Sequence, residues 1–436
     1  MNTLLHEILA ARETRATKQK QLLAEFKLPL VCFTMNIAGP VKDSPMIRRA
    51  FDEGVSLLSK QLSGIVHRKI FYAATGCEGY FSVAADVKTI KAICTAIEES
   101  CPLGRLFDMD VLDIDGTKLE RKVERSCLIC GKAGRFCAAS RAHDVSLLQQ
   151  TTERIISSHF AILDANRIAD AAVQSLLDEV HITPKPGLVD ENNCGSHTDM
   201  DIPLFEKSAH ALRPYFLRCV QIGQLSPDHC FPTLRQAGID AEKRMFAVTN
   251  GINTHKGAIF TLGLLCGAAG ALGNSTLSPQ GILHKAQILA EPYVMVDFSH
   301  ITAPKTAGER LYQTYGLTGI RGEAAKGFPC VANLGLPVYQ QQLARGKSQN
   351  DAAAITLLHL LIQVEDTNLY HRGSAEGAAF AQNAAAALLP EPTMAEISEL
   401  DEKFIEKNLS PGGCADLLAA TLFLHKLSNQ GVDPHG

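Results

Sequence analysis

The hydrophobic pattern of this 436-residue chain changes once, near residue 144. Before that point, short β-rich runs alternate with helical periods, and after it long helical periods dominate while polar residues gather in loops. The change predicts an N-terminal α/β (α+β) domain in residues 1–155 and an all-α domain in residues 156–436. In the first domain we expect four strands, at residues 29–37, 69–75, 80–85 and 106–114, and two helices, at residues 45–62 and 86–100.

The composition excludes some classes of protein. A net charge of −4 argues against a nucleic-acid-binding protein, which usually carries a basic excess. The apolar stretches at residues 260–273 and 352–364 are too short to span a membrane, so we expect buried helices there. Residues 1–27 have the pattern of an amphipathic helix rather than a signal peptide, and the 13 cysteines are then reduced thiols. We therefore expect a cytoplasmic protein without a membrane partner.

The predicted strand at 106–114 carries two carboxylates. Asp108 and Asp110 are two residues apart, so they point to the same face, next to Arg105. Paired carboxylates that repel one another suit a divalent metal holding phosphates, such as Mg²⁺. Two solvated carboxylates on an edge strand remain the alternative.

A strand-to-helix turn lies earlier in the same domain. Ser44 is expected to cap the helix that Pro45 begins. Lys42, Arg48 and Arg49 surround this helix start, which suits an anion, although a capped helix with exposed arginines explains the pattern equally.

Three cysteines and a histidine follow within 17 residues. Cys127, Cys130, Cys137 and His143 have the ligand types of a zinc site. Because a second CxxC pair is absent, reduced structural thiols remain the alternative.

The helical domain places polar residues in five loops. A packed core does not need so many, and a shared site for polyphosphate and metal explains them better than separate helix caps. The candidates are Lys185, Asp190, His197 and Asp199 in the first loop, Asn253, Thr254, His255 and Lys256 in the second, and Arg321, Glu323, Asp366, Asn368, Arg372 and Asp416 in the others.

These motifs resemble two enzyme families joined in one chain. GPVKDSPMIRR, GCEGYFSVA, PLGRLFDMDV and the cysteine cluster resemble the apo-citrate lyase phosphoribosyl-dephospho-CoA transferases, also called citrate lyase holo-acyl-carrier-protein synthases. KPGLVDENNCGSHTDMD, GINTHKGAIF, YGLTGIRGEA and NLSPGGCADLL resemble the triphosphoribosyl-dephospho-CoA synthases. The chain departs from the family at Cys77, Glu365 and Ser374, where proline, glycine and glycine are more usual.

The resemblance implies a bifunctional transferase. ATP and 3′-dephospho-CoA would give triphosphoribosyl-dephospho-CoA and adenine, and the phosphoribosyl-dephospho-CoA would then pass to a serine of the citrate lyase acyl carrier protein, with release of pyrophosphate. Asp190, His197 and Asp199 would bind Mg²⁺ or act as a base, with Glu323, Asp366 and Asp416 in the remaining metal or base roles. Lys185, His255, Lys256 and Arg321 would hold phosphates in the synthase, and Arg105, Lys42, Arg48 and Arg49 in the transferase.

Two other functions remain open at this level. The same prosthetic group serves malonate decarboxylase, so the chain could mature that enzyme instead. A non-catalytic helical adaptor with a zinc knuckle would also contain the cysteine cluster.

Overall fold

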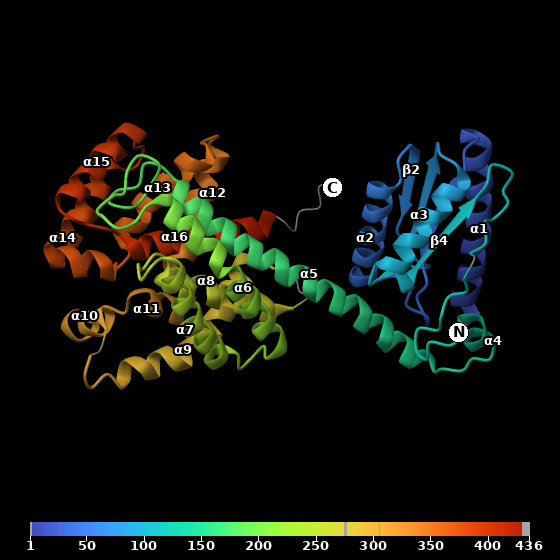
Figure 1. Cartoon of the computed structure of the whole chain (residues 1–436), viewed down its shortest axis with the longest axis horizontal. Coiled ribbons are helices and arrows are strands. Elements are labelled where there is room, and N and C mark those ends of the chain that lie inside the picture. The colour runs from blue at the N-terminus through green and yellow to red at the C-terminus, as the bar shows by residue number, and fades with distance from the viewer. Residues whose placement is uncertain (1, 122, 274–276, 305, 430–436) are drawn as a thin grey trace. The chain divides into compact units, whose positions relative to one another are not determined.

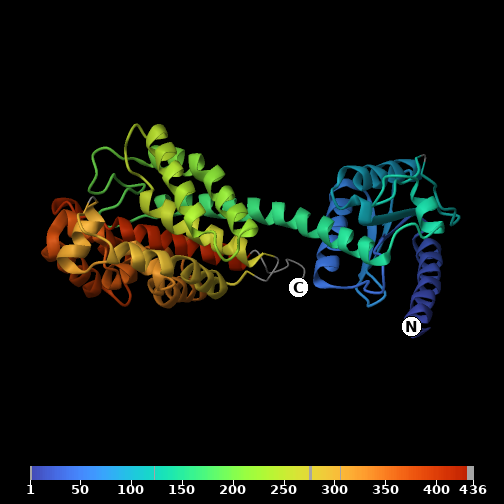
Figure 2. The same cartoon turned by 90° about the horizontal axis from the view of Figure 1, so that it is seen from below.

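The computed structural model describes residues 2–121, 123–273, 277–304 and 306–429, and the chain forms two compact units, Met1–Ile162 and Leu163–Gly436. The chain passes between them within one long helix, α5 (Val145–His181) (Figure 2). A small antiparallel sheet lies in the first unit and the remainder is mostly helical. The domain boundary near residue 155 stays a prediction.

The smaller unit is built on a four-stranded sheet. The strands are β1 (Leu30–Met35), β2 (Ile65–Phe71), β3 (Glu78–Val83) and β4 (Phe107–Leu112), in the spatial order β2-β3-β1-β4. All three pairings are antiparallel, which makes this unit α+β. β4 is an edge strand, so one of its long edges has no neighbouring strand in the described sheet and later segments can pack beside it.

Side chains alternate between two apolar clusters, one on each face of the sheet. On one face, Leu30 and Cys32 pack against Leu22 and Leu23 of α1 (Asn2–Phe26). The opposite face, which carries Val31, is covered by α2 (Pro45–Gln61), α3 (Val87–Ser100) and the start of α5 (Figure 1). Leu112 belongs to the α1 face, so Asp110 and Asp108, two and four residues before it, lie on that face too.

The start of α2 agrees with the sequence-based prediction, whereas the bounds of β2 and β3 differ from it. Ser44 caps α2 by accepting a hydrogen bond from the Ile47 N–H at 3.2 Å, as predicted. The strand predicted at residues 69–75 is wrong in its bounds, because β2 runs from Ile65 to Phe71 and the chain then turns before β3. Glu78 and Gly79, expected in the connection, belong to β3, where Arg15 of α1 pairs with the buried Glu78 at 2.9 Å.

The larger unit contains eleven α-helices after α5 among the described residues, together with a short π-helical turn, Val331–Gly335. They are α6 (Ile202–Leu225), α7 (Phe231–Val248), α8 (Lys256–Leu272), α9 (Pro279–Ser299), α10 (Ala307–Tyr315), α11 (Gly319–Ala325), α12 (Leu336–Ala344), α13 (Gln349–Gln363), α14 (Thr367–Leu388), α15 (Met394–Glu406) and α16 (Gly412–Asn429).

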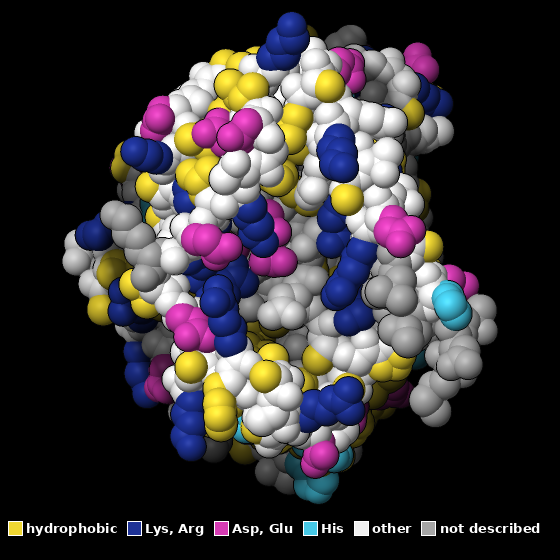
Figure 3. All heavy atoms as spheres, turned by 90° about the vertical axis from the view of Figure 1, so that its right-hand side faces the viewer, with side chains coloured by type: hydrophobic (Ala, Val, Ile, Leu, Met, Phe, Trp, Pro, Cys, Tyr) yellow, Lys and Arg dark blue, Asp and Glu magenta, His cyan; other side chains and the backbone are white. Residues whose placement is uncertain are grey.

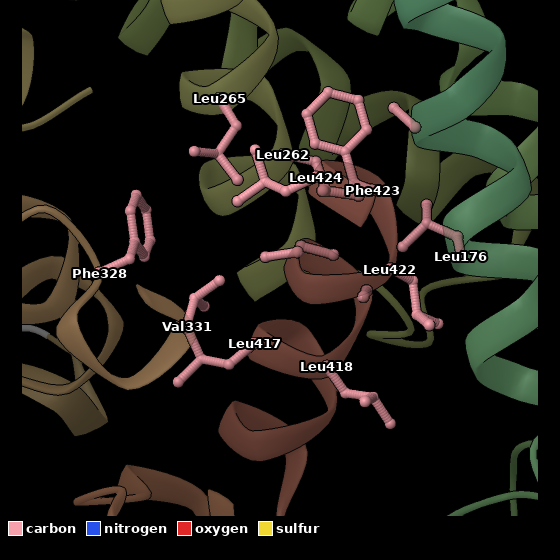
Figure 4. Packing of buried hydrophobic residues seen from close by; sticks show 14 of the residues in the cluster. Leu176, Leu262, Leu265, Phe328, Val331, Leu417, Leu418, Leu422, Phe423 and Leu424 are labelled. Atoms are coloured by element: carbon pink, nitrogen blue, oxygen red, sulfur yellow. The ribbon is translucent and has the colours of Figure 1, made fainter. Parts of the chain in front are cut away.

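The core of the larger unit surrounds α8 and α16. Leu262 and Leu265 of α8 lie near Leu417 and Leu424 of α16 in one cluster (Figure 4). α6 and α8 approach closely, since a Cβ on Gly223 would meet the Gly267 carbonyl oxygen at 2.0 Å. Both predicted buried helices are confirmed as α8 and α13. Within the described chain, no helix has both the length and the apolar character that crossing a bilayer requires.

Candidate functional sites

A large cavity in the smaller unit lies beside the edge strand β4. Its volume is about 820 Å³, and we call it the arginine cavity; its lining includes Arg105, Asp108, Asp110, Lys118, Arg125 and Arg141. Seven lysine and arginine side chains line it, against five carboxylates. Figure 3 shows one face of the molecule on which Lys and Arg side chains gather beside a hollow, with Asp and Glu among them.

Asp108 and Asp110 lie on one side of β4, as their spacing predicts. Asp110 accepts a hydrogen bond from the Lys118 ammonium at 2.7 Å, and the Arg125 guanidinium lies 3.9 Å from Asp108. Partial burial, and then the charge of Asp110, raise the pKa of Asp108 above its usual value. A cation between the two carboxylates would relieve both effects.

The structure does not place the three other predicted phosphate ligands in the lining of this cavity. Lys42 donates to the Ile37 carbonyl, Arg48 forms a two-point ion pair with Asp43, and the Arg49 guanidinium lies 3.9 Å from the centre of the Phe160 ring. Arg105 does line the cavity, where it donates to the Ser126 carbonyl. A phosphate role for Lys42, Arg48 and Arg49 therefore stays a prediction without support from this geometry.

The cysteines predicted as zinc ligands converge. The ligand atoms of Cys127, Cys130, Cys137 and His143 all lie within 4.8 Å of one another. Backbone N–H groups of Cys130 and Ile129 lower the pKa of Cys127 to about 6.

The five polar loops of the larger unit line three cavities. The acidic cavity, of about 320 Å³, includes Lys256, Glu323, Lys326, Glu365, Asp366 and Asp416. The inner cavity, of about 250 Å³, includes Glu179, Lys185, His197, His255, Arg372 and Asp416. The outer cavity, of about 620 Å³, includes Arg310, Tyr315, Tyr370, His371, Arg372 and Ser374.

The three cavities share lining residues. Asn253, Lys256, Asn368 and Asp416 line both the acidic and the inner cavity, while Arg372 lines both the inner and the outer cavity. Residues from loops far apart in the sequence therefore lie together around three adjoining cavities, and a single shared site remains a prediction.

Helix starts surround the acidic cavity. Its lining includes Lys256 at the start of α8, Thr367 at the start of α14 and Gly413 at the start of α16. The unpaired N–H groups and dipoles of helix N-termini favour anions. An acidic cavity with this backbone environment suits a polyphosphate accompanied by a cation.

Three carboxyl groups of the acidic cavity have raised pKa values. Burial is the first cause for each: it raises the pKa of Glu323 and Asp366 above the usual range, and the pKa of Asp416 well above it. For Asp416 the charges of Asp366 and Glu179 add to the effect. Asp366 also caps α14 and accepts a 2.8 Å bond from the Cys414 N–H, so it joins two of the loops.

Asp190 organises its loop from the inside. Its carboxylate accepts hydrogen bonds from the backbone N–H groups of Lys185, Asn192 and Asn193, at 2.9, 2.8 and 3.1 Å. Asp190 is buried and does not line the three cavities, and Asp199 is exposed and also outside their lining. This geometry favours a loop-holding role for Asp190 over the predicted Mg²⁺ contact.

Lys185 has an ion-pair partner, Glu179, that was not predicted from the sequence. The buried Lys185 ammonium donates to the Glu179 carboxylate at 2.7 Å. Glu179 lies seven residues after Ala172 and three after Leu176, both buried on α5, so all three share one face of the helix. A charged residue on this apolar face was the available signal.

His255 is held as a neutral imidazole. Burial first, then the nearby Lys185, lower the pKa of His255 to about 3, and its Nδ1 lies 2.8 Å from the Ser208 hydroxyl. That hydroxyl also accepts a bond from Thr254 at 2.7 Å. His255 Nε2 is buried in the inner cavity without a hydrogen-bond partner among the described residues.

Arg372 connects three loops. It donates to the Ser196 carbonyl at 2.8 Å, to the Asn408 side chain at 2.9 Å and to His197 Nδ1 at 3.3 Å. His197 Nε2 then lies 2.9 Å from the Ser410 hydroxyl, and burial, followed by the charge of Arg372, lowers the pKa of His197. Arg321, by contrast, lies over the Phe298 ring and outside the lining of the three cavities.

Gly257 is expected to be essential for this geometry. A Cβ on Gly257 would lie 1.8 Å from a carboxylate oxygen of Asp416, so Gly257→Ala must displace that carboxylate. Because displacement by about 1 Å can lower a rate about 100-fold, we expect a loss of that size in the reaction of the larger unit. Gly308→Ala is the matched control, since nothing lies within 4 Å of its added Cβ. Equal rates for the two variants would contradict the assignment of Asp416 to the site.

Ser374 adopts a backbone conformation that suits glycine. It lies inside α14 with φ 58° and ψ −166°, where a Cβ is strained. We expect Ser374→Gly to stabilise the larger unit by about 1 kcal/mol, measured by thermal or urea unfolding. Ser374→Ala keeps the strain and should give no such gain, and an unchanged or lower stability of the glycine variant would contradict the strain.

Comparison with known families matches each unit separately. A family model described as ATP:dephospho-CoA triphosphoribosyl transferase, CitG, matches residues 165–434. A second, described as apo-citrate lyase phosphoribosyl-dephospho-CoA transferase, CitX, matches residues 3–159.

Curated relatives match nearly the whole chain. A protein named CitXG from Haemophilus influenzae is 35% identical, covering 96% of this chain and 95% of its own length. A protein of the same name from Leuconostoc mesenteroides subsp. cremoris is 34% identical, with 97% of each chain covered. A 2-(5''-triphosphoribosyl)-3'-dephosphocoenzyme-A synthase from Haemophilus ducreyi is 37% identical and covers 69% of this chain and 99% of its own.

Proposed function

The chain belongs to the CitXG family of bifunctional citrate lyase maturation proteins, and on this premise we propose one reaction for each unit. The larger unit joins ATP to dephospho-CoA at the acidic, inner and outer cavities. The smaller unit transfers the product at the arginine cavity. The observation that carries the proposal is the acidic cavity, where starts of helices from separate loops meet the buried Asp366 and the half-buried Glu323 and Asp416. The citrate lyase description of the first unit's family favours citrate lyase over malonate decarboxylase as the enzyme that is matured.

ATP would occupy the acidic and inner cavities. The triphosphate would lie at the start of α8, where Lys256 and backbone N–H groups meet anions. The donor set fits Mg²⁺, which prefers one or two carboxylates together with phosphate oxygens. Glu323 and Asp416 are the best-placed carboxylates, because both line the acidic cavity, whereas Asp366, which also lines it, already accepts three backbone N–H groups.

The reaction would replace one glycosidic bond with another. The ribose 2′-hydroxyl of dephospho-CoA attacks the anomeric carbon of the ATP ribose, the bond to adenine breaks, and the hydroxyl proton leaves for a base. The developing positive charge on the sugar is stabilised by nearby carboxylates. Asp416, whose pKa burial raises well above its usual value, holds a proton more strongly than an ordinary carboxylate and is a candidate for this base.

Dephospho-CoA would enter through the outer cavity. Tyr315 and Tyr370, whose ring centres lie 5.6 Å apart, offer surfaces on which a nucleobase can stack. The positively charged Arg310 and Arg372 could bind the pyrophosphate of dephospho-CoA. Arg372 also lines the inner cavity, so the two substrates would meet beside it.

The smaller unit would perform the second reaction. A serine hydroxyl of the acyl carrier protein attacks the α-phosphate of the triphosphoribosyl group, and pyrophosphate leaves. Asp108 and Asp110 suit Mg²⁺, and the cations of the arginine cavity would neutralise the phosphates. We place the protein in the cytoplasm, where these substrates are made.

Two assays test the proposal. The full-length protein with ATP, Mg²⁺ and dephospho-CoA should release adenine, and no adenine should appear without dephospho-CoA. After the carrier subunit is added, mass spectrometry should find phosphoribosyl-dephospho-CoA on one serine. A protein that binds the carrier but releases no adenine would instead be the helical adaptor.

A further inference from the structure

The segment between β4 and α5 has almost no core of its own. Between Val111 and Ile156, Cys137 is the only buried hydrophobic residue in the described part of the chain. The segment nevertheless supplies Arg125, Arg135 and Arg141 to the wall of the arginine cavity. Arg121 and Arg125 tie its first part to the buried Glu98. The part around residues 126–143 needs another source of order, because short segments without a core require a cross-link or a metal.

The four predicted ligands have the spacing of a metal site. All four ligand atoms lie within 4.8 Å of one another, and the sulfurs of Cys130 and Cys137 are 3.5 Å apart. A tetrahedral zinc with Zn–S bonds of about 2.3 Å would place its sulfurs about 3.8 Å apart. A disulfide needs sulfurs about 2.05 Å apart, and all thirteen cysteines are free.

The backbone around Cys127 and Cys130 forms a tight knuckle. The Ile129 N–H points to the Cys127 sulfur at 3.4 Å, and the Gly131 N–H donates to the Cys127 carbonyl at 3.2 Å. Gly131 has φ +71°, and Ser126 pairs with Ala133 across the turn. N–H groups directed at a sulfur stabilise a thiolate, which is the form that binds a metal.

His143 gives an independent indication. Its Nε2 atom is buried and has no hydrogen-bond partner among the described residues. Buried polar atoms are nearly always paired, so an unpaired nitrogen on a histidine grouped with three cysteines points to a missing ligand. The Ala142 N–H donates to the Cys137 carbonyl at 3.0 Å, and this turn brings His143 back to the cysteines.

We propose that Cys127, Cys130, Cys137 and His143 bind one structural zinc ion that holds the wall of the arginine cavity in place. Three sulfurs and one imidazole complete a tetrahedral site and leave no position for substrate, which is typical of structural rather than catalytic zinc. Cys127, Cys137 and His143 themselves line the arginine cavity, but the zinc proposal is argued from the geometry of these ligands and does not depend on the proposed function.

Metal analysis of the full-length protein tests the proposal. After dialysis, the purified protein should contain one zinc ion per chain, measured by inductively coupled plasma mass spectrometry. Cys130→Ser and Cys137→Ser should lose it. Cys101→Ser in the smaller unit and Cys194→Ser in the larger unit are matched controls and should keep it. Zinc retained by the cluster variants would place the ion elsewhere and overturn the proposal.

A second measurement does not depend on the folding of variants. Zinc-stripped wild-type protein titrated with Co²⁺ should develop thiolate-to-cobalt charge-transfer absorption of an intensity expected for three thiolates. Stripping should also speed limited proteolysis within residues 113–144, and zinc should reverse this effect. A protein that gives no such absorption, and whose cleavage does not respond to zinc, has reduced structural thiols instead.

Discussion

Asp416→Asn is expected to lower the dephospho-CoA-dependent release of adenine by about 100- to 1000-fold, the usual cost of removing one charged group that stabilises a transition state. Asn keeps the shape of the side chain and can still accept the hydrogen bond that Asp416 receives from Ala258. It cannot bind Mg²⁺ as an anion or take a proton. The measurement is adenine formed per minute, separated by chromatography.

The same substitution should stabilise the fold at neutral pH. Burial raises the pKa of Asp416 well above its usual value, so the folded protein disfavours the ionised carboxylate. The stability that Asp416 contributes is complete below the unfolded pKa of about 3.9 and is lost as the pH rises through the folded pKa. Asn does not ionise, so the melting temperature of the variant should exceed that of the wild type at pH 7, and the difference should disappear near pH 4.

The two effects together separate a catalytic role from a structural one. A purely structural Asp416 would lose stability and activity together. Asp240→Asn is the control, because Asp240 is exposed on α7, lies outside the lining of the three cavities, and pairs with Lys243 at 2.9 Å. The variant should also still transfer preformed triphosphoribosyl-dephospho-CoA to the carrier protein, since that step belongs to the other unit. Normal adenine release by Asp416→Asn would exclude Asp416 from the reaction.

Local periodicity made several features predictable from sequence. Asp108 and Asp110 share a face because strand side chains alternate, whatever the rest of the fold does. α8 and α13 were predictable as buried helices because both are apolar on every side. Asp416, Asp366 and Lys256 could be selected as one site because five polar loops in an all-helical domain favour a shared polyphosphate and metal site over separate helix caps.

Other features depend on contacts that no local pattern encodes. Asp190 and Asp416 are both carboxylates beside helices, yet one accepts three backbone N–H groups of its own loop and the other lines two cavities. Whether such a carboxylate binds its own backbone or lines a cavity depends on the conformation of the loop. β2 starts four residues before its predicted bound, because an exposed edge strand carries a weak hydrophobic signal. Lys185 was expected to hold phosphate, but its ammonium is paired with Glu179 from the preceding helix.

Asp110→Asn is expected to impair the transfer reaction and spare adenine release, the reverse of Asp416→Asn. Transfer of the prosthetic group to the carrier protein should fall by at least about 100-fold, because the arginine cavity loses an anionic ligand for Mg²⁺. Adenine release should be unchanged. Loss of the Asp110 charge also removes one cause of the raised pKa of Asp108, so Asp108 should ionise at lower pH in the variant. Supplying preformed triphosphoribosyl-dephospho-CoA isolates the transfer step, which mass spectrometry of the carrier subunit then measures.

The control for this experiment lies in the adjacent turn. Asp115 is exposed, does not line the arginine cavity and accepts the Thr117 N–H at 2.8 Å, a bond that asparagine can also accept. Asp115→Asn should therefore transfer at the wild-type rate. If Asp110 acts through the metal, more Mg²⁺ should be needed for half-maximal transfer by its variant. An unchanged Mg²⁺ requirement combined with a normal rate would leave Asp110 as a surface partner of Lys118, 2.7 Å away, and would move the transfer site away from β4.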